Sequence, residues 1–210
     1  MKLYGFWRSA AAFRVRIALN LKGLSPETVS IDLMAGEQSK AGYDAVNPLH
    51  VVPTLVDGNA VLHQSVAIIE YLDETHPEPS LLPGDAVMRA RIRAVALAIA
   101  ADTHPLHTVR IYRYLVDAHG IDDDQFTAWT AQWLNAGFSA VEKTLKDTNG
   151  DFCFGDTPTL ADCCLVPQLA VAERFGIDME SFPTLQGIGE KCQQLPAFEK
   201  ALPANQPDAA

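Results

Sequence analysis

The sequence is poor in cysteine and in positive charge, and it has no long hydrophobic run. Its 4 cysteines form no C-x-x-C pair and lack the spacing of metal ligands, which favours reduced core cysteines over a disulfide framework or a metal site. The longest apolar run near the middle, residues 94–101, is far too short to span a bilayer. The N-terminus has no charged segment followed by an apolar stretch and a cleavage site. We therefore expect a cytoplasmic protein without a membrane span and without a bound metal.

The chain is acidic. Lysine and arginine number 16 against 26 for aspartate and glutamate, so the formal charge is −10 at pH 7. This charge disfavours nucleic acid and anionic membrane surfaces as partners. The length of 210 residues and the hydrophobic content of 48% are sufficient for a sizeable core in one or two domains. An anionic ligand would need a local concentration of arginine, because arginine pairs with a carboxylate through two parallel donors.

The first segment places a serine at the start of a helix. Residues 2–6 predict a buried strand, the turn Trp7, Arg8 and Ser9 follows, and apolar residues at helical spacing predict a helix that stops at Gly23. Ser9 then lies where a helix has unpaired backbone N–H groups and the positive end of its dipole, which favours an anion such as a thiolate. Serine is also a preferred N-cap residue, so a purely structural role is the alternative.

The next segment completes an α/β pattern. The sequence predicts strands at residues 27–31, 54–56 and 60–62 and a helix at 65–75. The order βαβ then ββα is typical of a thioredoxin-like domain, in which the proline before the third strand, here Pro53, often has a cis bond. Val52 would then offer its backbone to an extended peptide. Gln64 and Ser65 open the last helix and can donate to a ligand carboxylate, with a plain N-cap role for Ser65 as the alternative.

A proline-rich segment, residues 76–84, separates this pattern from an all-helical one. The helices expected beyond it cover about 86–115, 123–145, 159–175, 182–194 and a short stretch near 197. Thr159 and Asp162 have the spacing of a capping box, to which we assign a structural role. We therefore expect an α/β thioredoxin-like N-terminal domain at residues 1–82 and an all-α C-terminal helical domain at 86–210.

A set of motifs carries a family resemblance. They are Tyr4-Gly5-Phe6-Trp7-Arg8-Ser9, Phe13-Arg14-Val15-Arg16-Ile17-Ala18-Leu19, Asn47-Pro48, Val52-Pro53-Thr54-Leu55, His63-Gln64-Ser65-Val66-Ala67-Ile68-Ile69-Glu70-Tyr71-Leu72, Leu81-Leu82-Pro83 and Thr159-Leu160-Ala161-Asp162. Through them the chain resembles the zeta class of glutathione transferases along essentially its whole length. The resemblance implies glutathione as cofactor and cis–trans isomerisation of a maleyl diacid, maleylpyruvate or maleylacetoacetate, in the breakdown of aromatic compounds.

The chain departs from the zeta pattern directly after Ser9. The family usually continues with a second serine and a cysteine, whereas this chain has Ala10-Ala11-Ala12. Ser9 and backbone N–H groups must then carry the activation of the thiolate.

The resemblance also implies roles for individual residues. Catalysis falls to Ser9 and Arg8; glutathione binding to Ser9, His50, Val52, Gln64, Ser65, Asp102 and His104; and binding of the dicarboxylate substrate to Arg8, Arg110 and Arg174. Asp102 is expected to reach the glutathione of a neighbouring subunit, which implies a homodimer. The other arginines of the first helix, Arg14 and Arg16, are assigned structural roles. The spacing of His104 and His107 also suits a metal, but Pro105 lies between them and no third ligand is evident.

Two other functions stay open. The same thiolate and arginines would serve a general zeta-class transferase that conjugates glutathione to α-halo acids. The fold could also act without catalysis as a ligand-binding or interaction module, against which the retention of Ser9 argues. The sequence does not distinguish maleylpyruvate from maleylacetoacetate, because they differ in the acyl tail.

Overall fold

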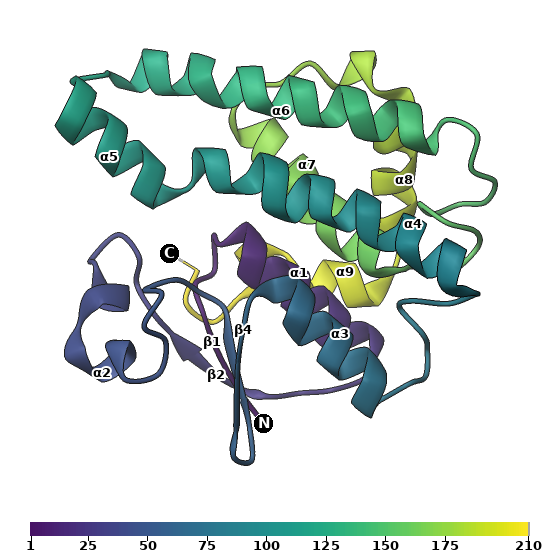
Figure 1. Ribbon diagram of the computed structural model, residues 1–210, viewed down its shortest axis with the longest axis horizontal. Coiled ribbons are helices and arrows are strands. Elements are labelled where there is room, and N and C mark those ends of the chain that lie inside the picture. Colours follow the sequence, from purple (N-terminus) through teal and green to yellow (C-terminus); the bar gives the residue numbers. More distant parts are fainter. Residues whose placement is uncertain (210) are drawn as a thin grey trace. The chain divides into compact units, whose positions relative to one another are not determined.

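The computed structural model describes residues 1–209 and divides into two compact units. The first unit contains Met1–Leu82 and the chain from Gln193 onward, and the second contains Pro83–Cys192. The chain after Gln193 therefore belongs with the first unit, whereas the sequence assigned it to the helical domain at residues 86–210. Its short helix α9 (Pro196–Ala201) lies beside the first helix of the chain (Figure 1). Asn20 Nδ2 donates to the carbonyl of Ala197 at 2.8 Å across that contact.

A four-stranded sheet with the order β2-β1-β3-β4 forms the first unit's centre. The strands are β1 (Lys2–Gly5), β2 (Glu27–Ser30), β3 (Thr54–Asp57) and β4 (Ala60–His63). β1 and β2 are parallel, while β3 is antiparallel to both β1 and β4. Leu3 and Leu55 pair across β1 and β3 and are buried. The β3–β4 turn has Gly58 at a φ of 56°, a conformation that glycine adopts without a Cβ penalty. The thioredoxin-like pattern is confirmed.

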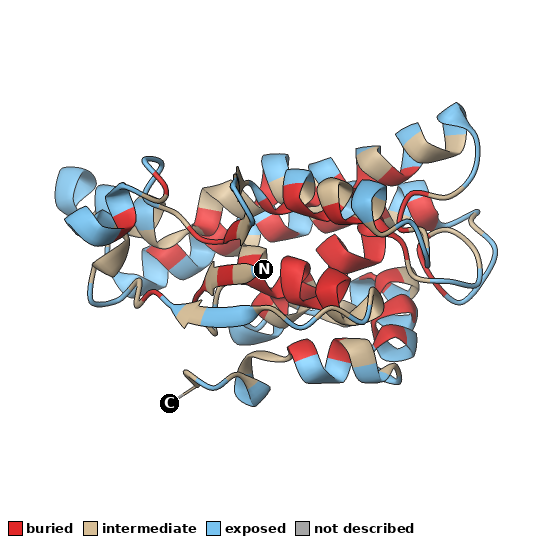
Figure 2. Ribbon diagram, turned by 90° about the horizontal axis from the view of Figure 1, so that it is seen from below, coloured by how far each residue is buried: buried red, intermediate tan, exposed pale blue. Residues whose placement is uncertain are grey.

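Helix α1 (Ala10–Leu21) packs against both α3 (Ser65–Thr75) and α9. It is buried along nearly its whole length from Ala10 to Leu19, whereas α9 buries only Phe198 and Ala201 (Figure 2). This burial explains the apolar composition of α1 and makes its two arginines, Arg14 and Arg16, unusual. A 3₁₀ turn (Glu37–Ser39) and the short helix α2 (Ala41–Asp44) connect β2 to β3.

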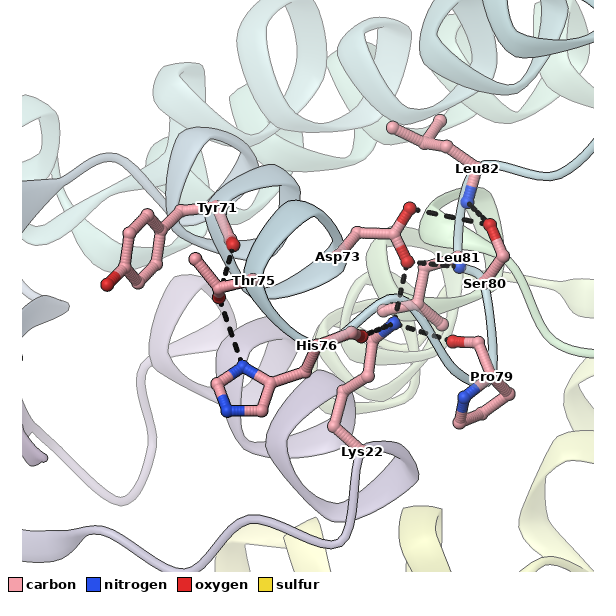
Figure 3. A network of polar contacts seen from close by, with 9 residues as sticks. All are labelled: Lys22, Tyr71, Asp73, Thr75, His76, Pro79, Ser80, Leu81 and Leu82. Atoms are coloured by element: carbon pink, nitrogen blue, oxygen red, sulfur yellow. Dashed lines mark hydrogen bonds and ion pairs between the residues drawn. The ribbon is translucent and has the colours of Figure 1, made fainter.

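The proline-rich connection after α3 is fixed to the first unit by Lys22 (Figure 3). The Lys22 side chain is fully buried, and its Nζ donates to Asp73 Oδ1 at 2.6 Å, to the carbonyl of His76 at 2.7 Å and to that of Pro79 at 2.6 Å. Asp73 Oδ1 also accepts from the backbone N–H of Leu81 at 2.6 Å. A buried ion pair needs such additional hydrogen bonds to offset the loss of hydration. The connection up to Leu82 is thus an ordered part of this unit.

The second unit is helical. It consists of α4 (Ala86–Leu97), a π-helical segment (Ala98–Thr103), a 3₁₀ turn (His104–His107), α5 (Val109–His119), α6 (Asp123–Leu145), α7 (Leu160–Arg174), a 3₁₀ turn (Met179–Ser181) and α8 (Pro183–Gln193). The expectation of one helix over 86–115 was wrong, because the helix loosens and turns between α4 and α5. Pro105 has no N–H to continue the helical ladder. Thr103 Oγ1 bonds the carbonyl of Ala98 at 2.8 Å, and a Cβ on Gly137 of α6 would clash with Thr103.

The capping box at α7 is confirmed as a structural element. Thr159 is the N-cap, and the fully buried Asp162 carboxylate accepts from the backbone N–H of Thr159 at 2.8 Å, from its hydroxyl at 2.9 Å and from the N–H of Cys153 at 2.8 Å. Burial raises the pKa of Asp162. Over residues 1–209, no helix is both long enough and apolar enough to cross a bilayer.

Candidate functional site

Ser9 is the N-cap of α1. Its φ of −69° and ψ of 117° are extended, and its Oγ accepts from the backbone N–H of Ala12 at 3.2 Å. This bond uses a lone pair of the hydroxyl and leaves its proton able to donate. The next residues are alanines, so only backbone N–H groups follow Ser9 in the first turn of the helix. The capping role and an anion-binding role are therefore compatible in one side chain.

Arg8 is exposed beside Ser9, with its guanidinium carbon 5.5 Å from the centre of the Trp7 ring. This cation–π contact holds the charge at the rim of the turn. In contrast, Arg16 is buried below the turn and donates to the carbonyl of Trp7 at 3.0 Å and to that of Phe6 at 3.4 Å. Arg16 thus supports the turn structurally, whereas Arg8 remains available to a ligand.

The start of α3 forms a second polar position. Gln64 is its N-cap and has a φ of 69°, in the left-handed region that few non-glycine residues adopt. Ser65 follows it and is buried, with its Oγ accepting from Nη1 of Arg14 at 3.3 Å. Since Arg14 is only 1% exposed, it places a positive charge behind the Ser65 hydroxyl. The arrangement suits a carboxylate, which would interact with the hydroxyl proton, the helix dipole and the buried charge.

The segment before β3 is held from behind. Tyr43 Oη donates to the carbonyl of Val51 at 2.7 Å, and Asn47 Nδ2 donates to the same carbonyl at 2.8 Å. Desolvation raises the pKa of Tyr43, which keeps this donor protonated. The Val52–Pro53 bond is cis, as the sequence pattern suggested, and Val52 is buried ahead of the β1–β3 ladder, which begins at Thr54.

His50 stands apart from this fixed backbone. It has a φ of 54°, and its exposed ring is within 2.6 Å, at Nε2, of Asp44 Oδ1. His50 precedes Val52 by two residues, and its contact with Asp44 holds the imidazole at the surface.

The sheet register brings these segments to one edge. Thr54 pairs with Tyr4 near the end of β1 and with His63 at the end of β4. The segments that follow β1 and β4 and the segment that precedes β3 therefore lie at the same edge of the sheet, and they contain Ser9, Ser65 and Val52, respectively. Figure 1 shows α1 and α3 on one side of this sheet. We conclude that the first unit gathers two helix N-termini and one ordered extended segment, a combination suited to a short peptide that carries an anionic sulfur and a carboxylate.

The remaining candidates lie in the second unit. Asp102 is exposed in the π-helical segment, His104 opens the 3₁₀ turn, and Arg110 is exposed in the first turn of α5. Arg174 is exposed at the end of α7, with its guanidinium carbon 5.1 Å from the centre of the Phe175 ring.

Ring contacts connect the two groups of second-unit candidates. The centroids of His104 and His107 are 5.2 Å apart, and those of His107 and Phe175 are 6.4 Å apart. The 3₁₀ turn thus lies against the end of α7, where Arg174 is. His107 Nε2 is 2.9 Å from Nε2 of Gln168, and this contact is buried. The His107 ring is therefore part of the helical core. Within residues 1–209, no group of three or more His, Cys, Asp or Glu side chains has the arrangement of a metal site.

Comparisons with known proteins cover the entire chain. The N-terminal domain of glutathione S-transferase matches residues 3–80, and its C-terminal domain matches residues 131–198. A probable maleylacetoacetate isomerase of Vibrio cholerae is 48% identical over 209 residues, covering 99% of this chain and 97% of the relative. This chain belongs to the zeta class of the glutathione S-transferase family.

Solved structures of the glutathione S-transferase family agree with this placement. The holo structure of a maleylpyruvate isomerase, a bacterial zeta-class transferase, has a TM-score of 0.98 and 47% identity, with all of both chains covered. A maleylacetoacetate isomerase of Anaeromyxobacter dehalogenans, with dicarboxyethyl glutathione and citrate bound in its active site, has a TM-score of 0.89 and 43% identity, covering 100% of this chain and 97% of that one. The two-domain transferase fold expected from the sequence is confirmed.

Arg14 has a contact with the candidate site that the sequence did not predict. An arginine among the apolar residues of a buried helix was assigned a structural role, yet the Arg14 side chain reaches the first residue of α3. No local pattern indicates this contact, because Ser65 lies 51 residues from Arg14 in the sequence.

Proposed function

We propose that this chain is a glutathione-dependent isomerase that converts a maleyl diacid, maleylpyruvate or maleylacetoacetate, to its fumaryl isomer in aromatic catabolism. The observation that carries the proposal is the arrangement of Ser9 and Ser65, two hydroxyls at helix N-termini placed at one edge of the same sheet. Full-length similarity to proteins described as maleylacetoacetate and maleylpyruvate isomerases supports the choice of reaction.

The donor set of the first unit fits glutathione. Ser9 and the N–H groups of α1 suit its sulfur, and Ser65 with Arg14 behind it suits the glutamyl carboxylate. The backbone of Val52 suits the cysteinyl peptide group, while Gln64 and His50 provide polar side chains on either side. When bound, glutathione supplies a thiolate whose reversible addition gives the double bond the freedom to rotate.

The chain's own residues have three tasks in this reaction. Ser9 would donate a hydrogen bond from its hydroxyl to the sulfur and, with the dipole of α1, would favour the thiolate over the thiol, whose ordinary pKa is about 8.5. Arg8, Arg110 and Arg174 hold the two substrate carboxylates and stabilise the negative charge that develops on the substrate.

We further propose that the active form is a cytoplasmic homodimer in which Asp102 reaches the glutamyl amine of the neighbouring subunit's glutathione. Asp102 is exposed in its own unit, as such a contact requires. His104 follows it on the 3₁₀ turn and would contribute to the same glutathione-binding region.

The test compares three kinds of substrate with glutathione present. We expect rapid turnover of maleylpyruvate or maleylacetoacetate, followed by the appearance of the fumaryl product, and slow turnover of chlorodinitrobenzene and of α-halo monocarboxylic acids. If both maleyl compounds are ignored while α-halo acids react, the chain is a general transferase. If glutathione stabilises the protein but no substrate reacts, a noncatalytic binding role replaces the isomerase.

A further inference from the structure

The turn that carries Arg8 and Ser9 is held by a residue from the far end of the chain. The backbone N–H of Trp7 donates to Asp208 Oδ2 at 3.1 Å, and the hydroxyl of Ser30 donates to the same oxygen at 2.7 Å. Ser30 is the last residue of β2, which is parallel to β1. One carboxylate oxygen therefore connects the turn after β1 to the end of the neighbouring strand.

Arg16 holds the opposite side of the same residue. Its Nη2 donates to the carbonyl of Trp7, and its Nε donates to the carbonyl of Ala201 at 3.1 Å. Burial lowers the pKa of Arg16 to about 10, and the negative charge of Asp208 opposes that shift. Trp7 thus has its N–H fixed by an anion and its C=O fixed by a cation, and the two charges support each other.

The chain around Asp208 is ordered by its own hydrogen bonds. Gln206 Nε2 donates to the carbonyls of Lys200 at 2.9 Å and Leu202 at 2.8 Å, which folds the segment back onto the end of α9. The backbone N–H of Ala209 donates to the carbonyl of Gln206 at 3.0 Å. Asp208 lies between Gln206 and Ala209, so hydrogen bonds hold the chain on both sides of it.

We propose that Asp208 is a positioning residue for the catalytic turn, acting through Trp7 to aim the Ser9 hydroxyl and the first N–H groups of α1 at the sulfur of glutathione. This role rests on the proposed function. The turn is short and closed, because the N–H of Ser9 donates back to the carbonyl of Phe6 at 3.0 Å. A shift of Trp7 is therefore transmitted directly to Ser9, two residues further on.

A positioning role and a simple charge effect predict opposite changes in the bound thiol. A carboxylate that acted only through space would raise the pKa of a nearby thiol, so removing it would lower that pKa. Loss of positioning instead weakens the donors to the thiolate and raises the pKa. Asn keeps an oxygen that can accept from Trp7 without the negative charge, whereas Ala keeps neither.

The experiment measures the pH titration of the thiolate absorbance of bound glutathione, together with kcat and the KM for glutathione, in Asp208→Ala and Asp208→Asn. The control is Glu199→Gln, which removes an exposed negative charge from α9 in the same C-terminal segment. Thermal melts in the presence and absence of glutathione establish that each variant is folded.

We expect Asp208→Ala to raise the pKa of the bound thiol and to lower kcat about tenfold, since small displacements of reacting groups have large rate effects. Asp208→Asn should recover most of the activity, and Glu199→Gln should match the wild type. A wild-type titration in Asp208→Ala, or a lowered thiol pKa in both Asp208 variants, would overturn the positioning role alone. A wild type that forms no thiolate with glutathione would overturn the proposed function and this role with it.

Discussion

The positions proposed for the sulfur, peptide and carboxylate of glutathione in the first unit are Ser9, the backbone of Val52 and Ser65, which are half-buried or buried. The charged candidates of the second unit, in contrast, are exposed. Ser9 and Ser65 are fixed by helix starts and by the register of the sheet. Arg110 is exposed in the first turn of α5, and Arg174 is exposed at the end of α7. The difference suggests a division of work, in which the first unit serves any reaction of glutathione and the second selects the substrate.

The largest effect is expected from Ser9→Ala. Loss of a donor to developing or bound negative charge costs about 10²- to 10³-fold in kcat, on all substrates alike. Stability should fall by only about 1 kcal/mol, because one capping bond is lost. The matched control is Asp85→Ala, which removes the N-cap of α4 and its bond to the N–H of Met88. If Ser9→Ala and Asp85→Ala lose stability and activity to the same modest extent, Ser9 is only a cap.

Arg110→Met and Arg174→Met test the second unit. Each change keeps much of the side-chain bulk and removes a charged contact to the substrate, which should cost about 2 kcal/mol in kcat/KM for a maleyl diacid. Chlorodinitrobenzene, which is neutral, should react at an unchanged rate. Arg91→Met, at an exposed position of α4, provides the control. If kcat/KM falls equally for charged and neutral substrates, the proposed division of work between the units is wrong.

Ser65→Ala addresses the carboxylate position in the first unit. A hydrogen bond to a charged group contributes about 1.5 to 3 kcal/mol, so the Kd for glutathione should rise about tenfold or more. The increase in Tm at a fixed glutathione concentration should shrink accordingly. Ser39→Ala, at an exposed position of the 3₁₀ turn after β2, should bind like the wild type. An unchanged Tm increase in Ser65→Ala would place the carboxylate elsewhere.

Asp102→Ala tests the second unit's contribution to glutathione. If Asp102 binds the amine of glutathione in a neighbouring subunit, the KM for glutathione should rise a few-fold, about 1 kcal/mol, while kcat at saturation stays constant. Asp117→Ala, on the exposed face of α5, is the control. Sedimentation at assay concentration should give a dimer, and a fully active monomer would contradict the shared site.

The smallest effect concerns Tyr43 and alkaline pH. Because the folded state raises the pKa of Tyr43 above its ordinary value of 10.0, the unfolded chain ionises first. Stability from this group is therefore complete below about pH 10 and declines as the pH rises above it. Tyr43→Phe should lose about 1 kcal/mol at neutral pH through the bond to Val51. Its Tm should then fall less steeply than that of the wild type in alkaline buffer, whereas parallel curves would exclude the linkage.

Much of the first unit could be predicted from local pattern. Ser9, Pro53 and Ser65 are marked by the change from strand to helix period and by proline, so the sequence located two helix starts and the segment between them. Arg14 and Asp208 could not be found in this way. Their partners, Ser65 and Trp7, are distant in sequence, and only the packing of α1 and the return of the chain after α9 bring them together.

The second unit was harder to predict. A continuous helical period from residue 86 gave no sign of the π-helical segment. The close approach of Thr103 at its end to Gly137 joins residues of two different helical elements, and no local pattern reveals it. Arg110 and Arg174 carry no local signal, since an exposed arginine at a helix end is common. Their assignment comes from family resemblance and awaits the substrate comparison above.

The packing of the C-terminal segment against α1 also affects the order in which the two units fold during synthesis. The ribosome releases the four strands and the helices α1 to α3 of the first unit before any part of the second unit, and domains generally fold as they emerge. Yet α1 finds the packing surface of α9 only after all of Pro83–Cys192 has been synthesised. The first unit therefore begins to be synthesised first but completes its fold last. The helical unit can be fully folded while α1 still exposes the face that α9 later covers.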